Sequence, residues 1–169
     1  MQDFDLKALY AALDEKRRSL AMTWADVARA VGTRHADRPD TKVSAGTITG
    51  MLRRRSVEAD GVLQMLRWLD RTPESFCGQD HGEPLSASAP AVLPGRTLRF
   101  DAAAIHAALD AKRAALGASW ATVAREIGGY SPQNLTRLAQ GGRVAFPGIM
   151  RVVRWTEVPS TRFMRATSR

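Results

Sequence analysis

The chain has few of the residues that export or a disulfide framework would require. Cys77 is the one cysteine among 169 residues, which excludes an internal disulfide and suits a reducing cytosol. No apolar run approaches the roughly eighteen residues of a membrane span, and no apolar signal-peptide segment follows Met1. The sequence therefore predicts a cytoplasmic protein without a membrane partner.

Patterns typical of catalytic and ligand sites are also missing. There is no glycine-rich phosphate loop and no Ser/His/Asp or Cys/His set in a plausible arrangement. Cys77, Asp80 and His81 fall short of the spacing that zinc sites show, and His35 and His106 lie far away in sequence. We therefore expect no enzyme, no metal site and no other cofactor.

Strand patterns are absent as well, whereas helical patterns are frequent. No segment alternates apolar and polar residues, but apolar residues such as Leu6, Leu9 and Leu13 recur at helical spacing. The sequence therefore predicts an all-α fold. The expected helices lie at about 5–20, 23–31, 44–54, 61–70 and 73–77, and then at about 101–116, 120–127, 132–140, 147–156 and 160–165.

The helical pattern occurs twice because the sequence is duplicated. Residues 4–32 match 100–128 at an offset of 96, and after an inserted loop at 33–42 the match continues to residue 163 at an offset of 87. Identical pairs include Phe4/Phe100, Asp5/Asp101, Leu13/Leu109, Asp14/Asp110, Lys16/Lys112, Arg17/Arg113, Trp24/Trp120, Val27/Val123, Arg29/Arg125, Gly32/Gly128, Ser44/Ser131, Thr49/Thr136 and Trp68/Trp155. We call residues 1–76 repeat one and residues 96–169 repeat two.

Between the repeats, residues 77–95 are rich in Gly, Pro, Ser and Ala, and the sequence predicts a flexible linker there.

Positive charge is concentrated in repeat two. The net charge is +8 with a pI near 10.7, which favours a polyanionic partner. Repeat one has 13 Lys and Arg against 11 Asp and Glu, whereas repeat two has 12 against 4.

The centre of repeat two predicts two short helices joined by a tight turn at Gly128 and Gly129. Ser131 is a good helix N-cap, and Pro132 suits the first helical position. In the helix that follows, one face is apolar and the opposite face carries amide and guanidinium groups. The apolar residues are Leu135 and Leu138, and the polar residues are Gln133, Arg137 and Gln140.

The stretch SWATVAREIGGYSPQNLTRL resembles the helix-turn-helix of the phage repressor/Cro family, also called the XRE family. Because the pattern occurs twice, the resemblance implies two tandem lambda-repressor-like five-helix domains, at 1–76 and 96–169, that bind double-stranded DNA. It assigns base reading to Gln133 and Arg137, with Asn134, Thr136 and Pro132 as further candidates. It assigns contacts with the DNA backbone to Ser119, Gln140, Arg143, Arg53, Arg54 and Arg55.

The corresponding residues of repeat one are poor base readers, since Ala45, Gly46 and Gly50 have almost no side chain. Our hypothesis is that repeat two specifies the sequence while the arginines of repeat one clamp phosphates. One chain would then act as a pseudo-dimer, in a nucleoid-associated transcriptional regulator of a bacterium or phage. Gly129 lengthens the turn of repeat two by one residue relative to the family pattern.

Other interpretations stay open at this point. Repeat one could bind a protein partner or form a homodimer, and the whole chain could be a helical interaction adaptor or antitoxin-like module that keeps the fold. A low-specificity architectural DNA-binding protein is a third alternative. Trp24 and Trp120 fit a core position better than a phosphate contact. Arg17 and Arg113 suit a contact with the DNA backbone and an internal ion pair equally well.

Overall fold

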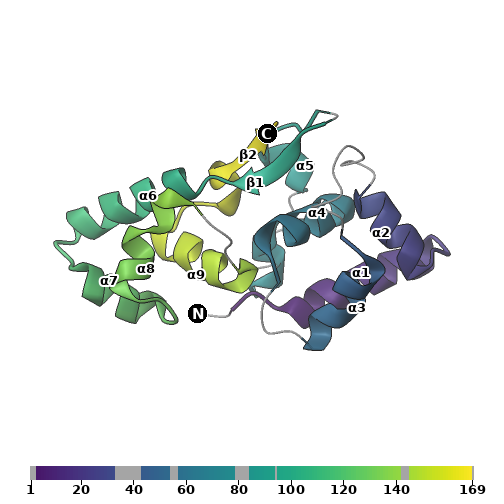
Figure 1. Cartoon of the computed structure of the whole chain (residues 1–169), viewed down its shortest axis with the longest axis horizontal. Helices are drawn as coiled ribbons and strands as arrows, with labels where there is room; N and C mark the ends of the chain where they lie inside the picture. Colours follow the sequence, from purple (N-terminus) through teal and green to yellow (C-terminus); the bar gives the residue numbers. More distant parts are fainter. Residues whose placement is uncertain are drawn as a thin grey trace.

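The computed structural model describes residues 3–32, 43–53, 57–78, 84–93, 95–141 and 145–168. This part of the chain is mainly helical and contains one small two-stranded sheet (Figure 1). Within the described ranges, none of the helices combines the length and the apolar character needed to cross a membrane. The mainly helical class predicted from the sequence is confirmed.

The two repeats contain the same helices at equivalent positions. Repeat one comprises α1 (Leu6–Ser19), α2 (Trp24–Gly32), α3 (Ala45–Gly50), η3 (Met51–Arg53), α4 (Ala59–Leu69) and η4 (Pro73–Phe76). Repeat two comprises α6 (Ala102–Ala115), α7 (Trp120–Ile127), α8 (Pro132–Thr136), η5 (Leu138–Gln140), α9 (Phe146–Thr156) and η6 (Ser160–Phe163). These bounds agree with the predicted helices to within about two residues. The helix predicted at 160–165 ends at residue 163.

The strictly all-α prediction is wrong for two segments. Strand β1 (Thr97–Phe100) pairs antiparallel with strand β2 (Met164–Thr167), so that Phe100 faces Met164. Each strand has only four residues, which is too short for a clear alternation of apolar and polar side chains. Their pairing also joins segments far apart in the sequence, a contact that local patterns do not reveal.

The prediction of a flexible linker at 77–95 is corrected in its described part. Cys77 is buried, and Leu85 begins a short helix, α5 (Leu85–Ser88), with only 2% of its surface exposed. The Asp70 carboxylate accepts hydrogen bonds from the backbone N–H of Ser86 at 2.8 Å and from its hydroxyl at 3.0 Å. This segment has few apolar side chains, but Cys77, Leu85 and Val92 among them are packed in or against the core of repeat one.

The hydrophobic core is shared between the repeats. One cluster lies within repeat two and includes Ile105, Leu109 and Leu135. The other cluster contains the core of repeat one together with residues from the linker and from repeat two. These additional residues are Cys77, Leu85, Leu98, Phe146, Met150 and Met164. Figure 1 accordingly shows α4 and α9 side by side between the outer helices of the two repeats.

The contacts between the repeats are related by a local twofold axis. Glu58 forms an antiparallel bridge with Ala145, and these two residues occupy equivalent positions in the two repeats. Near the beginning of η4 and η6, the Glu74 carboxylate accepts hydrogen bonds from the backbone N–H and the hydroxyl of Ser160, at 2.7 and 2.9 Å. Residue 160 is equivalent to residue 73. Such self-pairing of equivalent residues is what a twofold interface requires.

Phe146 occupies the centre of this interface. Its ring lies 4.6 Å from that of Phe4 in an edge-to-face arrangement and 5.8 Å from that of Phe100. Phe4 and Phe100 are themselves equivalent residues, so one ring from α9 packs against the same position of both repeats. Edge-to-face aromatic pairs add to the free energy gained by burying the rings.

We expect the Phe146→Ala substitution to lower the free energy of unfolding of the whole chain by about 3–5 kcal/mol, because it empties a fully buried ring site. Urea unfolding followed by circular dichroism and tryptophan fluorescence would measure this loss, and we expect one cooperative transition. Leu93→Ala is the control, since Leu93 is 62% exposed and should change stability by less than about 0.5 kcal/mol. Two separate transitions, one of them unaffected by Phe146→Ala, would contradict a shared core.

Candidate nucleic-acid interface

Helices α7 and α8 begin at well-defined caps. The hydroxyl oxygen of Ser119 accepts a hydrogen bond from the Thr122 N–H at 3.1 Å, and that of Ser131 accepts one from the Asn134 N–H at 3.1 Å. The N-cap role predicted for Ser131 is confirmed, and Ser119 caps α7 in the same way. Gly128 and Gly129 between the helices have φ values of 71° and 74°, a conformation that favours glycine. The caps and the glycine turn together fix where each helix starts.

The predicted base-reading residues lie on the outer face of α8. Leu135 is fully buried and anchors the helix, whereas Gln133, Asn134 and Arg137 are exposed. Within the described part of the chain, no side-chain hydrogen bond or ion pair engages these three residues. Pro132 is exposed at the first helical position, and the Thr136 hydroxyl donates to the Gln133 carbonyl at 3.0 Å. The helix thus presents an amide and guanidinium surface that has no side-chain partners among the described residues.

The residues predicted to contact the DNA backbone differ in how exposed and how available their side chains are. Gln140 is exposed at the end of η5, and Arg53 is exposed at the end of η3. The Ser119 hydroxyl already caps α7 and lies 3.0 Å from the Thr122 hydroxyl. Arg54, Arg55 and Arg143 lie outside the described residues.

One exposed arginine next to this surface was not selected from the sequence. Arg125 lies on the outer face of α7, and no ion pair within the described ranges engages it. Its equivalent in repeat one, Arg29, is paired with Asp26 at 3.0 Å. Repeat two has Thr122 at the position of Asp26, so Arg125 lacks this acidic neighbour. Comparing the two repeats position by position would have revealed the difference.

Asp26 also changes the beginning of α2. Its carboxylate accepts hydrogen bonds from the Thr23 hydroxyl at 2.6 Å and from the Thr23 N–H at 2.9 Å. The side-chain hydrogen bond with Thr23 is the main reason why the pKa of Asp26 lies below its usual value. A carboxylate at this helix end repels phosphate, whereas the equivalent end of α7 has no acidic residue in its first turn.

The residues of α3 that correspond to the exposed polar residues of α8 have small side chains. Ser44 caps the helix by accepting a hydrogen bond from the Thr47 N–H at 3.0 Å. Gly46 is exposed, and the Thr49 hydroxyl donates to the Ala45 carbonyl at 3.0 Å. The helix is therefore formed in repeat one, but its side chains are too short to reach far from the surface.

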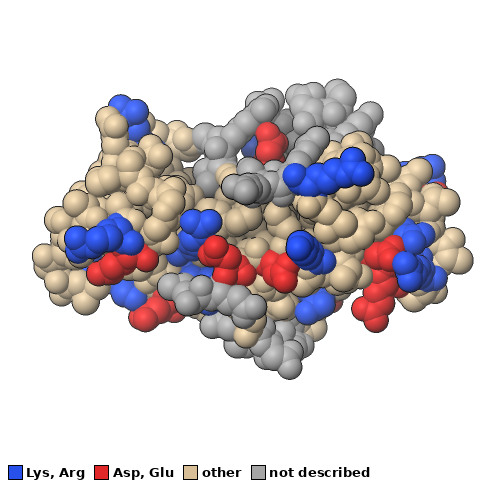
Figure 2. Space-filling model, turned by 90° about the horizontal axis from the view of Figure 1, so that it is seen from below, with Lys and Arg blue, Asp and Glu red and all other residues tan. Residues whose placement is uncertain are grey.

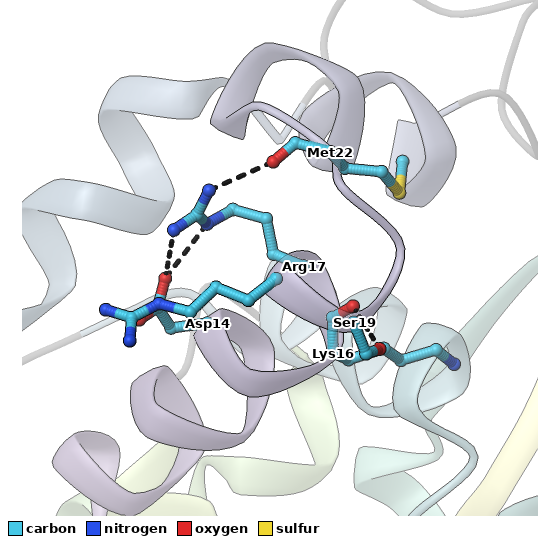
Figure 3. Close-up of polar contacts among 6 residues, drawn as sticks. Asp14, Lys16, Arg17, Ser19 and Met22 are labelled. Atoms are coloured by element: carbon cyan, nitrogen blue, oxygen red, sulfur yellow. Dashed lines mark hydrogen bonds and ion pairs between the residues drawn. The ribbon is translucent and has the colours of Figure 1, made fainter.

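The guanidinium group of Arg17 makes contacts within the protein (Figure 3). Its guanidinium group donates to Asp14 at 2.6 and 2.9 Å and to the Met22 carbonyl at 3.0 Å, and it lies over the ring of Trp24. Arg113 makes the equivalent contacts with Asp110, with the Ala118 carbonyl and with the ring of Trp120. Both tryptophans are half-buried and pack against the cores. These four residues support the helices in the structure.

Charges of both signs are mixed on the face shown in Figure 2. Lys and Arg side chains occur there in separate groups, several of them beside Asp or Glu, and they do not merge into one continuous basic area. Ion pairs such as those of Arg17 with Asp14 and of Arg113 with Asp110 offset part of the positive charge of the chain. Arginines without an ion pair in the described ranges, such as Arg125 and Arg137, are therefore more informative than the net charge.

Cys77 does not provide an accessible metal ligand. The side chain is buried, and burial is the largest cause that raises the pKa of its thiol to about 11. Metal ions bind the thiolate form, which this environment disfavours. Asp80 and His81 lie outside the described residues, and among those described no three His, Cys, Asp or Glu residues form a group suited to a metal ion.

Comparison of the chain with protein-family models, with curated proteins and with solved structures finds no match. The interpretation of this surface therefore depends on the residues of the chain itself.

We expect Cys77 to react slowly with iodoacetamide at pH 8 in the folded chain. With a pKa of about 11, only about one thiol in a thousand is ionised at that pH, and the sulfur is also shielded from solvent. Mass spectrometry over time would measure the reaction, and denaturing the chain in guanidinium chloride should accelerate it strongly. Rapid alkylation without unfolding would be inconsistent with a buried Cys77.

Proposed function

We propose that the chain is a sequence-specific double-stranded DNA-binding protein that regulates transcription. In this proposal each repeat is a lambda-repressor-like helix-turn-helix domain, and α8 of repeat two enters the major groove. The observation that carries the proposal is the row of exposed polar side chains on α8 that have no partners within the described chain. Such side chains fit a ligand rich in hydrogen-bonding groups.

The chemistry of α8 suits base edges. Arg137 can donate two hydrogen bonds to guanine, and Gln133 can both donate to and accept from adenine. These residues are four positions apart, so their side chains share one face of the helix. Asn134 and Thr136 are further candidates, and Pro132 can contact the methyl group of thymine. Arg125 and Gln140 would contact phosphates on either side of the groove.

The twofold packing supports the idea of an intrachain pseudo-dimer. In a symmetric repressor dimer, the interface sets the separation of two equivalent reading helices. Here the shared core around Phe146 would hold α3 and α8 at a constant separation. Because α3 carries small side chains, the bound site would contain sequence information mainly in the half that α8 contacts. In this scheme Arg53, Arg54 and Arg55 would clamp phosphates beside α3.

Repeat one also supports a second candidate function, a helical interaction module related to antitoxins or adaptors. Three features of repeat one suit a protein partner better than phosphate. They are the small side chains of α3, the neighbouring Leu52 with 45% of its surface exposed, and the acidic beginning of α2 at Asp26. In this case repeat one would bind a protein partner or a second copy of the chain. The exposed Arg125 and Arg137 favour DNA for repeat two.

Selection of bound duplexes from a random pool at about 150 mM salt would test the proposal with the whole chain. Enrichment of one compact motif would support sequence-specific binding. Binding without enrichment, but with strong salt dependence, would instead indicate an architectural protein. If the chain binds no duplex, the interaction module becomes the better explanation.

We expect Arg137→Ala to weaken binding to the selected motif by about 1–3 kcal/mol and to relax the preference at one base pair. Affinity for an unrelated duplex should change little, since the substitution removes base readout. Arg125→Ala is the charge-matched control and should weaken binding to both duplexes while lowering the salt dependence by about one counterion. Fluorescence anisotropy at several salt concentrations would measure both effects. Equal weakening on all duplexes by Arg137→Ala would contradict its assigned role.

A further inference from the structure

A single arginine of α9 supports the turn between α7 and α8 from beneath. Nη1 of Arg151 donates a hydrogen bond to the Gly128 carbonyl at 3.3 Å. The same atom also lies directly against Gly129, where an added Cβ would be only 2.5 Å away. The guanidinium group therefore fills the space that a side chain at position 129 would occupy.

The turn has little support of its own. Its two glycines have φ values of 71° and 74° and no side chains with which to pack. Glycine is also the residue with the greatest backbone freedom, so two in succession form a natural hinge. The next residue, Tyr130, is half-buried against α9, where its hydroxyl lies close to Gly148. Helix α9 thus holds the turn at two places, and α8 begins immediately afterwards.

The other side of the Arg151 guanidinium group reaches repeat one. Its Nε atom lies 3.1 Å from Oδ1 of Asp3, in the segment that precedes α1. Asp3 is followed by Phe4, whose ring packs against Phe146 at the beginning of α9. The ion pair is therefore located beside the shared core.

The equivalent contact on the other side of the twofold axis is made by different chemical groups. Arg151 corresponds to Gln64, whose side-chain amide donates to the Leu98 carbonyl at 3.2 Å. Arg99, which follows Leu98, is the equivalent of Asp3, and it pairs with Asp60 of α4 at 3.2 Å. Both contacts join the two repeats, but Gln64 itself makes a neutral hydrogen bond with backbone whereas Arg151 makes an ion pair.

We propose that Arg151 is a positioning residue through which the Asp3 segment of repeat one sets the orientation of α8. The guanidinium group connects two groups that belong to different repeats, the Gly128 carbonyl and the Asp3 carboxylate. Its effect on DNA recognition rests on the function proposed above. Its effect on the turn does not, because the contacts are internal to the protein.

The consequence for recognition follows from the geometry of hydrogen bonds. Contacts with base edges need donors and acceptors to be aligned, and they weaken steeply when the angle departs from linear. Attraction to phosphate depends mainly on charge and tolerates a change of helix angle. Loss of the Arg151 contacts should therefore reduce discrimination between sequences more than it reduces affinity for DNA in general.

Amide hydrogen exchange of the whole chain is the first test, with three single variants. Arg151→Met removes the guanidinium group and keeps most of the side chain, and Asp3→Asn removes the charge without changing the shape of the side chain. Arg165→Met is the control, because Arg165 lies on β2 and pairs with Asp101 at 3.7 Å. We expect the amides at positions 128–131 and 133 to exchange at least about fivefold faster in Arg151→Met and Asp3→Asn, with no such change in the control.

Asp3→Asn is the decisive variant, since residue 3 is remote in sequence from the turn and its side chain is 61% exposed. Circular dichroism would verify that each variant is folded. If Arg151→Met accelerates exchange at the turn but Asp3→Asn does not, the coupling to repeat one is wrong. If neither variant changes exchange there, the proposal that Arg151 holds the turn is wrong.

DNA binding provides the second test. We expect Arg151→Met to reduce the ratio of affinities for the selected motif and an unrelated duplex by about tenfold, and Asp3→Asn to reduce it by a smaller factor. A wild-type chain that discriminates, together with an Arg151→Met variant that discriminates equally well, would overturn the proposed role in recognition. A wild-type chain that binds no DNA would instead refute the proposed function, while the exchange experiment would still decide whether Arg151 holds the turn.

Discussion

Burial of Phe146 between Phe4 and Phe100 is the contact on which the arrangement of the chain depends. It joins the cores of two repeats that would each be small for an independent domain, since short chains bury a limited share of their surface. The β1–β2 sheet and α5 extend this shared core at its edge. Relative movement of the repeats would expose these apolar groups to water, so the hydrophobic effect itself opposes separation.

The same helices carry different surfaces in the two repeats. Internal contacts are retained almost residue by residue, as the Arg17 and Arg113 networks illustrate. External positions have diverged, because Asp26 neutralises Arg29 whereas Thr122 leaves Arg125 without that partner. The pattern is what we expect if the fold needs both repeats while only one must keep an exposed polar reading surface. It also explains why the net charge is carried almost entirely by repeat two.

Much of the fold could be predicted from the sequence, because helix signals are local. The cap at Ser131 and the periodic leucines gave helix bounds close to those observed. The strands, the burial of Leu85 and the ion pair between Asp3 and Arg151 depend on segments far apart in the sequence, which no local pattern contains. On the candidate surface, the exposure of Gln133 and Arg137 follows from helical periodicity. The difference between Arg125 and Arg29 could have been found by comparing the two repeats position by position, because Thr122 replaces Asp26.

The pseudo-twofold interface has an evolutionary consequence. In a homodimer, one codon change alters both sides of the symmetry axis at once, so a residue on the axis must always be compatible with itself. Here Glu58 faces Ala145, and a glutamate facing its own copy would place two like charges together. Covalent linkage of the repeats lets each half of the interface mutate separately. Gene duplication therefore allows asymmetric pairs, such as Arg151 with Asp3 opposite Gln64 with Leu98, that a symmetric dimer could not contain.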